Sequence, residues 1–473
     1  MKYIATIGLE VHVQLLTRTK MFCACKTDYG VPPNTHVCPV CLGYPGALPV
    51  INAEAVRLTV LTGLMLGSKI NRFSKFDRKN YFYPDMPKNY QISQYDAPFC
   101  IGGGVEIVCD GKAKKVTLTR IHLEEDVAKN MHAGNASSVD FNRAGVPLME
   151  IVTEPDMASP EEAFAFLLAL KQILTYGIVS RCNLEEGNVR CDINCSMRPE
   201  TQTKLGTKAE IKNLNTFKGV FQALKYEISR QEEVLKSGGV IKQETRRWDS
   251  DLGVTESMRS KEEAHDYRYF PDPDLPPVAL TEELIAAWRE KIPELPRQRC
   301  ERLQRQYSIP EYDAKVISAD KAMADFFEAA AGDSGNSKAV SNWLMTEMLR
   351  MLTEKEMEIE SVKITPNALA GLVKLAAAGK INSNSAKQIF AVMFEKGGSP
   401  EQLMSDLGLD QVSDAGLLDK LVDAAVAANP KSAADYRGGK EAALKFLVGQ
   451  VMRLSRGKAN PQMAQELLKK KLS

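Results

Sequence analysis

The sequence predicts an α+β protein in which a mostly antiparallel sheet domain with helices precedes all-α domains. Roughly the first 290 residues mix strand patterns with a few helix patterns, and two of the strands flank the turn signal Asp110-Gly111. The helices there occur singly between hairpins, which is typical of α+β folds and not of wound parallel sheets. Beyond two proline clusters, residues 270–277 and 292–296, we find no strand pattern.

The first predicted strand, residues 8–15, alternates strictly between apolar and polar side chains. Its polar face carries Glu10, His12 and Gln14. Glu10 and His12 are two residues apart, roughly 7 Å along a strand, so one ion or substrate could contact both. An edge strand with a solvated polar side is the simpler alternative, but later strands repeat the same design.

Helices are predicted where a capping residue precedes an apolar stripe. In the first part of the chain they run from the Asn52 cap to about Leu66, from the Ser159 capping box to about Gly177, and from Thr216 onward. In the second part they include the helix from Thr365-Pro366 to Gly379, the helix over 440–454 and a last helix after the Asn460-Pro461 cap.

These elements predict three domains. Residues 1–292 form a sheet domain that contains the cysteine-rich segment 23–41, residues 293–398 a helical domain, and residues 399–473 a helical tail domain. The glycine-rich segment 397–400 is the expected second linker.

The charge balance limits the classes of partner. Lys+Arg (61) and Asp+Glu (60) cancel, so any contact with nucleic acid must come from local patches. Residues 401–429 hold one basic and six acidic side chains, whereas residues 430–473 hold ten basic and three acidic ones. The basic end fits a phosphate-backbone footprint, and solvated surface lysines are the alternative interpretation.

The chain shows no apolar stretch near 20 residues and no signal or targeting leader at its start. Its ten cysteines then indicate thiols in a reducing compartment, so we expect a cytoplasmic protein without a membrane contact.

Four of the cysteines form two close pairs within 19 residues: Cys23, Cys25, Cys38 and Cys41. Four thiolates satisfy tetrahedral zinc without a further ligand, which is the structural kind of site. His36 lies in the same loop and could replace one of them. Other cysteines, such as Cys191 and Cys195, alternate with apolar residues and are expected in the core.

The segment from Lys75 to Tyr90 interleaves basic, amide and aromatic residues with prolines. Lys and Arg neutralise phosphate charge, and tyrosines can stack on a base. Aromatics packed in a corner of the core, with the basic groups in water, are the alternative. The sequence contains no G-x-x-x-x-G-K-[ST] motif, so a nucleotide bound here would not use a P-loop.

Three later segments repeat the polar-faced strand: 121–126, 148–154 and 187–196. Glu150 falls on the polar face of the second and Asp192 on that of the third. A sheet face this rich in charge is costly to bury without a purpose. Carboxylates with a histidine suit a Mg²⁺ ion that keeps waters and binds phosphate oxygens, and nearby cations such as Arg190 would offset charge on a transferring phosphoryl group.

Several of these motifs resemble those of one known family. They are I-G-L-E-V-H-V-Q-L, the C-x-C…C-P-V-C-L-G-Y-P-G segment, F-D-R-K-N-Y-F-Y-P-D-M-P-K, H-L-E-E-D, F-N-R-A-G-V-P-L-M-E-I-V-T-E-P-D, E-G-N-V-R-C-D-I-N and A-E-I-K-N-L-N-T-F. The sequence resembles the family of B subunits of the bacterial aspartyl/glutamyl-tRNA amidotransferases over nearly its whole length. The absence of an insertion before the tail argues against the archaeal Glu-specific relative, and the absence of a leader against the mitochondrial version.

The resemblance implies one component of an ATP-dependent carbon-nitrogen ligase. Its amino-terminal domain would hold the 3′ end of Glu-tRNA(Gln) or Asp-tRNA(Asn), and ATP would phosphorylate the side-chain carboxylate of the attached amino acid. Ammonia from glutamine, hydrolysed on an amidase A subunit, would then displace the phosphate. A small C subunit would complete the heterotrimer, and the basic tail would hold the tRNA.

The same resemblance supplies the candidate site residues. The catalytic candidates are Glu10, His12, Glu124, Glu125, Glu150 and Asp192. The Mg²⁺ ligands would be Glu10, His12, Glu125, Glu150 and Asp192, and the zinc ligands Cys23, Cys25, Cys38 and Cys41. The candidates for contact with ATP or the tRNA terminus are Lys79, Tyr81, Lys88 and Arg190. Simple alternation favours Glu124 over Glu125, so Glu125 as a ligand would need a bulge.

Two rival functions remain open. The chain could be a tRNA-binding adaptor of such a complex, with the sheet serving only for docking. It could also be an unrelated Mg²⁺-dependent ligase for a small carboxylic acid, and the basic tail is the main feature against that alternative.

Overall fold

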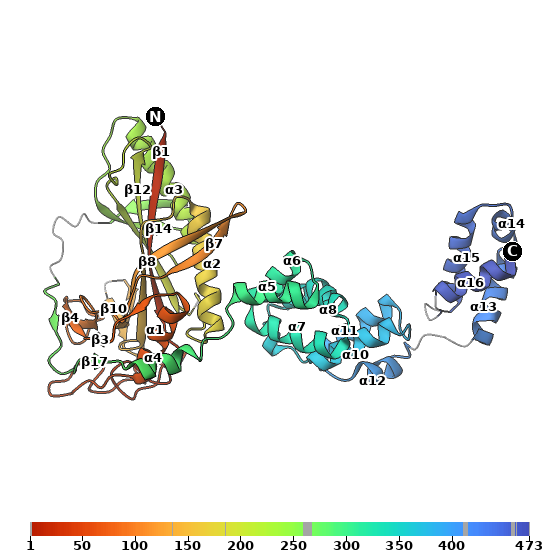
Figure 1. Cartoon of the computed structure of the whole chain (residues 1–473), viewed down its shortest axis with the longest axis horizontal. Helices are drawn as coiled ribbons and strands as arrows, with labels where there is room; N and C mark the ends of the chain where they lie inside the picture. The colour runs from red at the N-terminus through yellow and green to blue at the C-terminus, as the bar shows by residue number, and fades with distance from the viewer. Residues whose placement is uncertain are drawn as a thin grey trace. The chain divides into compact units, whose positions relative to one another are not determined.

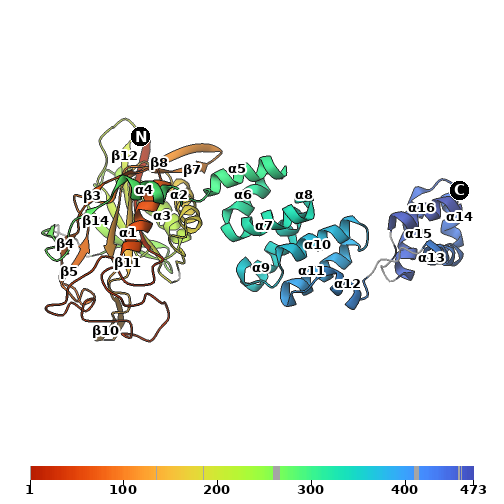
Figure 2. The same ribbon diagram turned by 60° about the horizontal axis from the view of Figure 1, so that its bottom comes forward.

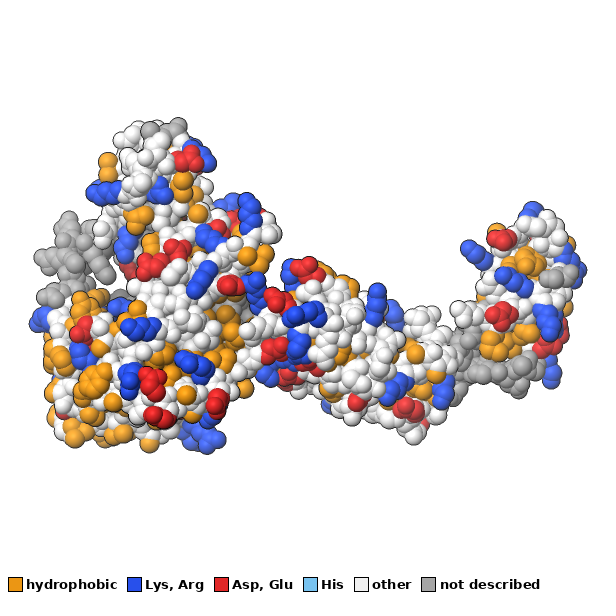
Figure 3. Space-filling view, viewed as in Figure 1, with side chains coloured by type: hydrophobic (Ala, Val, Ile, Leu, Met, Phe, Trp, Pro, Cys, Tyr) orange, Lys and Arg blue, Asp and Glu red, His pale blue; other side chains and the backbone are white. Residues whose placement is uncertain are grey.

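The computed structural model describes residues 2–134, 136–184, 186–258, 267–409, 415–455, 459 and 461–472 (Figure 1). Its contacts divide the chain into two compact units, residues 1–295 and 296–473. The visible face of each unit mixes acidic and basic side chains (Figure 3). No described helix is long and apolar enough to cross a membrane.

The first unit is built on a ten-stranded sheet in the order β15-β14-β13-β12-β1-β11-β8-β6-β2, with β7 paired to β8. Its pairs are antiparallel except β13 with β14. The strands are β1 (Tyr3–Gln14), β2 (Lys69–Ile70), β6 (Cys100–Ile101), β7 (Gly104–Cys109), β8 (Lys112–Glu125), β11 (Pro147–Thr153), β12 (Val189–Pro199), β13 (Ala209–Lys212), β14 (Glu244–Asp249) and β15 (Val254–Ser257). The prediction of an α+β fold with a mostly antiparallel sheet is confirmed.

Helices cover the apolar face of this sheet. They are α1 (Ala53–Met65), α2 (Pro160–Tyr176) and α3 (Phe217–Lys236), and α2 lies beside α3 (Figure 2). Asn52, Ser159 and Thr216 cap them through side-chain oxygens that accept backbone N–H groups, as the sequence predicts. The alternate residues Ile7, Leu9, Val11 and Val13 of β1 are fully buried in this core. The burial of this face leaves Glu10, His12 and Gln14 on the opposite one.

Smaller sheets complete the first unit. One has the order β16-β4-β5, and β5 contacts β8; two others pair β9 with β10 and β3 with β17. The bounds are β3 (Phe73–Ser74), β4 (Asp77–Asn80), β5 (Tyr90–Ser93), β9 (Lys129–Ala133), β10 (Ala136–Asp140), β16 (Phe270–Pro271) and β17 (Val278–Ala279), followed by helix α4 (Glu282–Arg289). The β4–β5 hairpin therefore brings the Lys75–Tyr90 segment to the polar end of β8.

All the named elements in the described part of the second unit are helices, and they form two hydrophobic cores. The first core is built from α5 (Pro296–Tyr307), α6 (Glu311–Ala319), α7 (Lys321–Ser334), α8 (Ser337–Trp343), the π-helical turn η1 (Leu344–Met348), α9 (Leu349–Lys355), the 3₁₀ turn η2 (Ile359–Ser361), α10 (Pro366–Ala377), α11 (Ser383–Lys396) and α12 (Pro400–Asp406). The predicted linker 397–400 lies between α11 and α12, and both helices contact α10.

The last core belongs to four helices: α13 (Ala415–Ala428), α14 (Pro430–Arg437), α15 (Glu441–Leu454) and α16 (Pro461–Leu472). The predicted cap Asn460 lies outside the described residues. The acidic α13 contacts the basic α16, and Nζ of Lys471 lies 2.6 Å from a carboxylate oxygen of Asp423 and 2.7 Å from one of Asp419. Part of the basic end is thus neutralised within the tail.

Candidate functional site

Four neighbouring strands bring charged side chains into one row on the polar face of the large sheet. His12 of β1 is paired with Arg190 of β12 on one side and with Glu150 of β11 on the other. Glu150 is in turn paired with His122 of β8. In an antiparallel sheet, residues directly opposite each other point to the same face. The row Arg190–His12–Glu150–His122 is therefore fixed by strand register.

Glu150 is at the centre of this row. Its Oε2 lies 3.1 Å from Nε2 of His122 and 3.5 Å from Nε2 of His12. Glu124, two residues after His122 on β8, places Oε1 4.0 Å from Nε2 of His12. One ligand atom each of His12, Glu124 and Glu150 lies within 4.8 Å of the others. We call these three residues the acidic cluster.

The acidic cluster concentrates charge in a mostly buried place. Burial by itself would raise the pKa of Glu150, but His122 and His12 outweigh it and hold that pKa well below the usual range. Burial would likewise lower the pKa of His122, yet the carboxylates of Glu150 and Glu124 raise it to about 9. The imidazoles and carboxylates thus stabilise each other's charged forms in the protein without a bound cation.

The donor atoms of the acidic cluster suit a divalent cation. Two carboxylates and one imidazole supply three ligands on one side, which leaves room for waters or substrate oxygens. Ser93 of β5 donates a hydrogen bond from Oγ to Oε2 of Glu124 at 3.1 Å, an outer contact of the kind that orients metal ligands. These residues therefore fit a site for a hard divalent cation.

Glu10 and Asp192 lie directly opposite each other on β1 and β12. Glu10 is two residues before His12 on β1, so this pair lies beside the acidic cluster on the same face. Asn194 donates a hydrogen bond to Glu10 at 2.9 Å, and Nζ of Lys212 lies 2.8 Å from Asp192. Burial lowers the pKa of His12, but Glu150, followed by Glu124 and then Asp192, raises it above the usual value. The structure thus brings both residues to the same face, although neither belongs to the close three-residue group.

Glu125 is not brought into this cluster. Its carboxylate accepts hydrogen bonds from Nζ of Lys88 at 2.6 and 2.7 Å and from the backbone N–H of Ile92 at 2.9 Å. The only irregularity between β8 and β11 lies at Val152/Thr153, so the bulge that a Glu125 ligand would need is absent from that ladder. Because Glu124 and Glu125 are consecutive residues of a strand, their side chains point to opposite faces of the sheet.

Lys79, on β4, stands next to the acidic cluster. Its Nζ lies 5.0 Å from the centre of the Tyr267 ring. Burial lowers the pKa of Lys79, but Glu124, Tyr269 and Glu150 raise it above the usual value. Tyr81 is half-buried nearby, and burial is the main reason that its pKa is raised, followed by the charges of Asp85 and Glu124.

Arg190 extends the row on the side of β12. Its Nη2 donates a hydrogen bond to Oδ1 of Asp126 at 2.6 Å, and Gln14 donates to the other oxygen of Asp126 at 2.9 Å. The Asp126 carboxylate is the largest cause of the raised pKa of Arg190. Arg190 therefore remains a cation at the edge of the site, held in place by Asp126.

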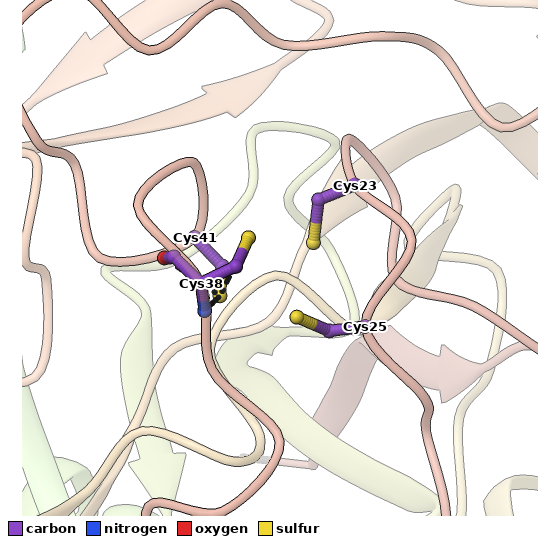
Figure 4. Close-up of side chains that lie close together, drawn as sticks. All are labelled: Cys23, Cys25, Cys38 and Cys41. Carbon is purple, nitrogen blue, oxygen red and sulfur yellow. Dashed lines mark hydrogen bonds between the residues drawn. The ribbon is translucent and has the colours of Figure 1, made fainter.

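The four predicted cysteine ligands converge in the loop after β1 (Figure 4). One Sγ from each of Cys23, Cys25, Cys38 and Cys41 lies within 4.8 Å of the others, so the group could hold a metal ion. The backbone N–H of Cys38 donates to Sγ of Cys41 at 3.2 Å. The Cys23 thiol, that N–H and Lys20 together hold the pKa of Cys41 down at about 4, even though burial raises it. The pKa values of Cys23 and Cys25 are raised instead, chiefly by the Cys41 sulfur for Cys23 and by burial for Cys25. Four sulfur donors this close together suit zinc.

Sequence reasoning did not select several residues that complete the site. The main one is His122, which the alternation of β8 places on the polar face. Its Nδ1 has no hydrogen-bond partner among the described residues. The others hold the chosen residues in position: Ser93, Asp126, Asn194 and Lys212. Alternation within 121–126 and 187–196 does place His122, Asp126 and Asn194 on the polar face, but it assigns them no role. Ser93 comes from a different sheet and carries no such pattern.

The first unit belongs to a known family of sheet domains, and most of the second unit belongs to a known family of helical domains. The family model described as "GatB/GatE catalytic domain" matches residues 5–286, and the model described as "GatB domain" matches residues 325–472.

Full-length relatives agree with these matches. The B subunit of the aspartyl/glutamyl-tRNA(Asn/Gln) amidotransferase of Thermoanaerobacter pseudethanolicus is 54% identical over 100% of both chains. The protein of the same name from Caldicellulosiruptor bescii is 51% identical over 100% of this chain and 99% of its own. That from Methylacidiphilum infernorum is 52% identical with the same coverage. The chain belongs to the family of aspartyl/glutamyl-tRNA(Asn/Gln) amidotransferase B subunits.

Proposed function

We propose that this chain carries the kinase and amidation site of a tRNA-dependent amidotransferase. ATP phosphorylates the side-chain carboxylate of Glu-tRNA(Gln) or Asp-tRNA(Asn), and ammonia then displaces phosphate to form the amide. The first step is needed because a carboxylate is a poor acyl donor, while an acyl phosphate offers ammonia a good leaving group. ATP is a substrate of this reaction.

The observation that carries the proposal is the acidic cluster on the polar sheet face. Two carboxylates and an imidazole within 4.8 Å of one another are costly to assemble next to a second buried imidazole. A divalent cation bound there would replace the protons that the two imidazoles carry in its absence. The acidic cluster supports chemistry at this place more strongly than a tRNA-docking role, which would not need a buried carboxylate cluster.

In this proposal His12, Glu124 and Glu150 hold Mg²⁺, and Glu10 and Asp192 bind its waters or a second cation. When bound, Mg²⁺ would neutralise phosphate oxygens and align them for transfer. Glu125 would not bind Mg²⁺ in this proposal; its carboxylate holds Lys88 in position through their ion pair.

The cations around the cluster would bind the reacting groups. Lys79 is near enough to Glu124 and Glu150 for their charges to raise its pKa, and its ammonium would balance charge on a transferring phosphoryl group. Arg190, held by Asp126, would bind a phosphate or the substrate carboxylate from the β12 side. Tyr81 and Lys88 lie in the loop between β4 and β5 and would contact ATP or the tRNA terminus.

The rest of the chain would support binding and assembly. We propose zinc in the four-cysteine site, where it would fix a loop that has little core of its own. The ten cysteines form no disulfide, and we propose that the protein works in the reducing cytoplasm. Ammonia would come from an amidase A subunit in a heterotrimer with a small C subunit, and the helical tail would bind the tRNA through its basic surface.

One experiment tests the function as a whole. The purified chain, combined with its amidase partner, is given ATP, glutamine and Glu-tRNA(Gln), and the amino acid on the tRNA is identified. Conversion of Glu-tRNA to Gln-tRNA that depends on this chain supports the proposal. If the chain only raises the affinity for tRNA while amidation proceeds without it, the adaptor interpretation is correct.

A further inference from the structure

A lysine is buried beside the four-cysteine site. The side chain of Lys20 is 0% exposed, although it follows a surface loop and belongs to no helix or strand. Lysine is almost never fully buried unless its ammonium is paired, because removal of an isolated charge from water is very costly. The pairing of Lys20 therefore needs an explanation.

The partners of Lys20 are a thiol sulfur and a carbonyl oxygen. Its Nζ lies 3.5 Å from Sγ of Cys41 and donates a hydrogen bond to the backbone oxygen of Phe141 at 3.1 Å. Among the described residues no ion pair joins Lys20 to a carboxylate. Glu125, which lines the same small cavity of about 90 Å³, is paired with Lys88.

A neutral thiol is a poor partner for a buried ammonium, but a metal-bound thiolate is a good one. Four cysteine thiolates around Zn²⁺ carry a net charge of −2, and one buried ammonium would reduce it to −1. We propose that Lys20 is the internal counter-charge of the metal-bound cysteine site and positions its Cys41 sulfur. This inference rests on the proposed zinc site.

The position of Lys20 also links that site to the catalytic sheet. The neighbouring backbone N–H of Met21 donates to the oxygen of Gly145 at 2.7 Å, two residues before β11, which carries Glu150. Gly145 has φ +85°, and a Cβ there would lie 3.5 Å from Cδ of Lys20 and 3.6 Å from Cβ of Cys41. The loop 141–146 thus closes over the ammonium, so an occupied cysteine site holds the start of β11 through Lys20.

The test compares Lys20→Met with Lys26→Met in the full-length chain. Lys26 is exposed in the same loop and forms an isolated backbone bridge with Thr19, so its side chain is the matched control. Zinc affinity is measured by competition with a chromophoric chelator. Lys20→Met should weaken zinc binding by about 10- to 100-fold, the usual effect of losing an outer contact of a metal ligand. Lys26→Met should stay within about threefold of the wild type.

A second comparison separates a charge effect from a packing effect. Lys20→Met is introduced into the wild type with zinc and into a Cys41→Ala background, and unfolding by urea is followed in both. Our proposal predicts destabilisation in the zinc-bound wild type and no loss, or a gain, in the background that lacks the thiolate. If Lys20→Met folds only in the Cys41→Ala background, that result supports the proposal. If it folds in neither background, Lys20 is needed for packing and the proposal is overturned.

Three further outcomes would count against these proposals, and they can be distinguished. Equal zinc affinity of Lys20→Met and the wild type overturns the counter-charge role. Equal destabilisation in both backgrounds shows that Lys20 only fills space, which overturns it as well. If the wild type binds no zinc, the proposed zinc site itself is wrong.

Discussion

Nε2 of His122 lies 3.1 Å from Oε2 of Glu150 across the ladder between β8 and β11, and both side chains are buried. The two groups come from segments almost 30 residues apart and meet on the polar face of the sheet. Their interaction keeps the carboxylate ionised and the imidazole protonated, so the pair stores a proton that a divalent cation would displace.

This pair predicts a pH dependence of stability in the protein without a divalent cation. The folded-state pKa of His122 is raised to about 9, above the unfolded value near 6.5. Its stabilisation is therefore fully present below pH 6.5 and is lost as the pH rises toward 9. Urea unfolding in the presence of a chelator should show such a loss in the wild type, on the order of 3 kcal/mol. A His122→Gln variant should show a smaller loss, because only His12, whose pKa is also raised, would still contribute. An equal pH profile in both proteins would contradict the assignment.

The neighbours Glu124 and Glu125 offer a matched pair for the cation site. Glu124→Gln removes a proposed ligand and should weaken Mn²⁺ binding, measured by electron paramagnetic resonance, by at least about tenfold. Glu125→Gln removes a carboxylate that pairs with Lys88 and should leave Mn²⁺ affinity nearly unchanged. The reverse order of effects would mean that Glu125 is the ligand after all.

The four-cysteine site predicts a defined metal content. Elemental analysis of the purified chain should find about one zinc ion per molecule. Cys38→Ser should lose it, while Cys109→Ser, on the β7–β8 hairpin, should keep it because that thiol lies outside the cluster. Retention of zinc in Cys38→Ser would show that three cysteines and another donor suffice.

The tail predicts a salt-dependent contribution to tRNA binding. Truncation after Leu409 removes helices with a hydrophobic core of their own, so the two preceding cores should stay folded. The affinity for tRNA should fall by at least about tenfold, and the slope of log affinity against log salt should become shallower by about 2 to 4. Unchanged affinity and slope would show that the tail does not contact tRNA, and retained Mn²⁺ binding serves as the control for folding.

Much of the site could be predicted from alternation alone. The period of two places Glu10 and His12 on one face and separates Glu124 from Glu125, and both expectations agree with the strand positions. Alternation cannot predict the order of the strands in the sheet. The neighbours of β1 are β11 and β12, and both strands come more than 130 residues after β1 in the chain. The contact between His12 and Glu150 could therefore be predicted only from the family resemblance or seen in the structure.

Other residues left no periodic signal. Ser93 reaches Glu124 from a separate small sheet, and Lys20 is one lysine in a loop whose burial depends on contacts with Cys41 and Phe141. The expectation for Glu125 came from the resemblance, and the regular β8–β11 ladder explains why its carboxylate points elsewhere. Long-range contacts of this kind depend on tertiary packing and not on local pattern.

The central claim is that the acidic cluster activates the substrate carboxylate. Its most direct test measures ATP-dependent phosphorylation of Glu-tRNA(Gln) by the reconstituted enzyme with Glu150→Gln, alongside tRNA affinity. Glu154→Gln is the control, because Glu154 follows β11 and accepts a hydrogen bond from Thr119 outside the cluster. We predict that Glu150→Gln reduces phosphorylation by at least about 100-fold, or about 2.7 kcal/mol, with tRNA affinity within a few-fold of the wild type. Phosphorylation at the wild-type rate, or loss of tRNA binding in parallel with activity, would contradict the account.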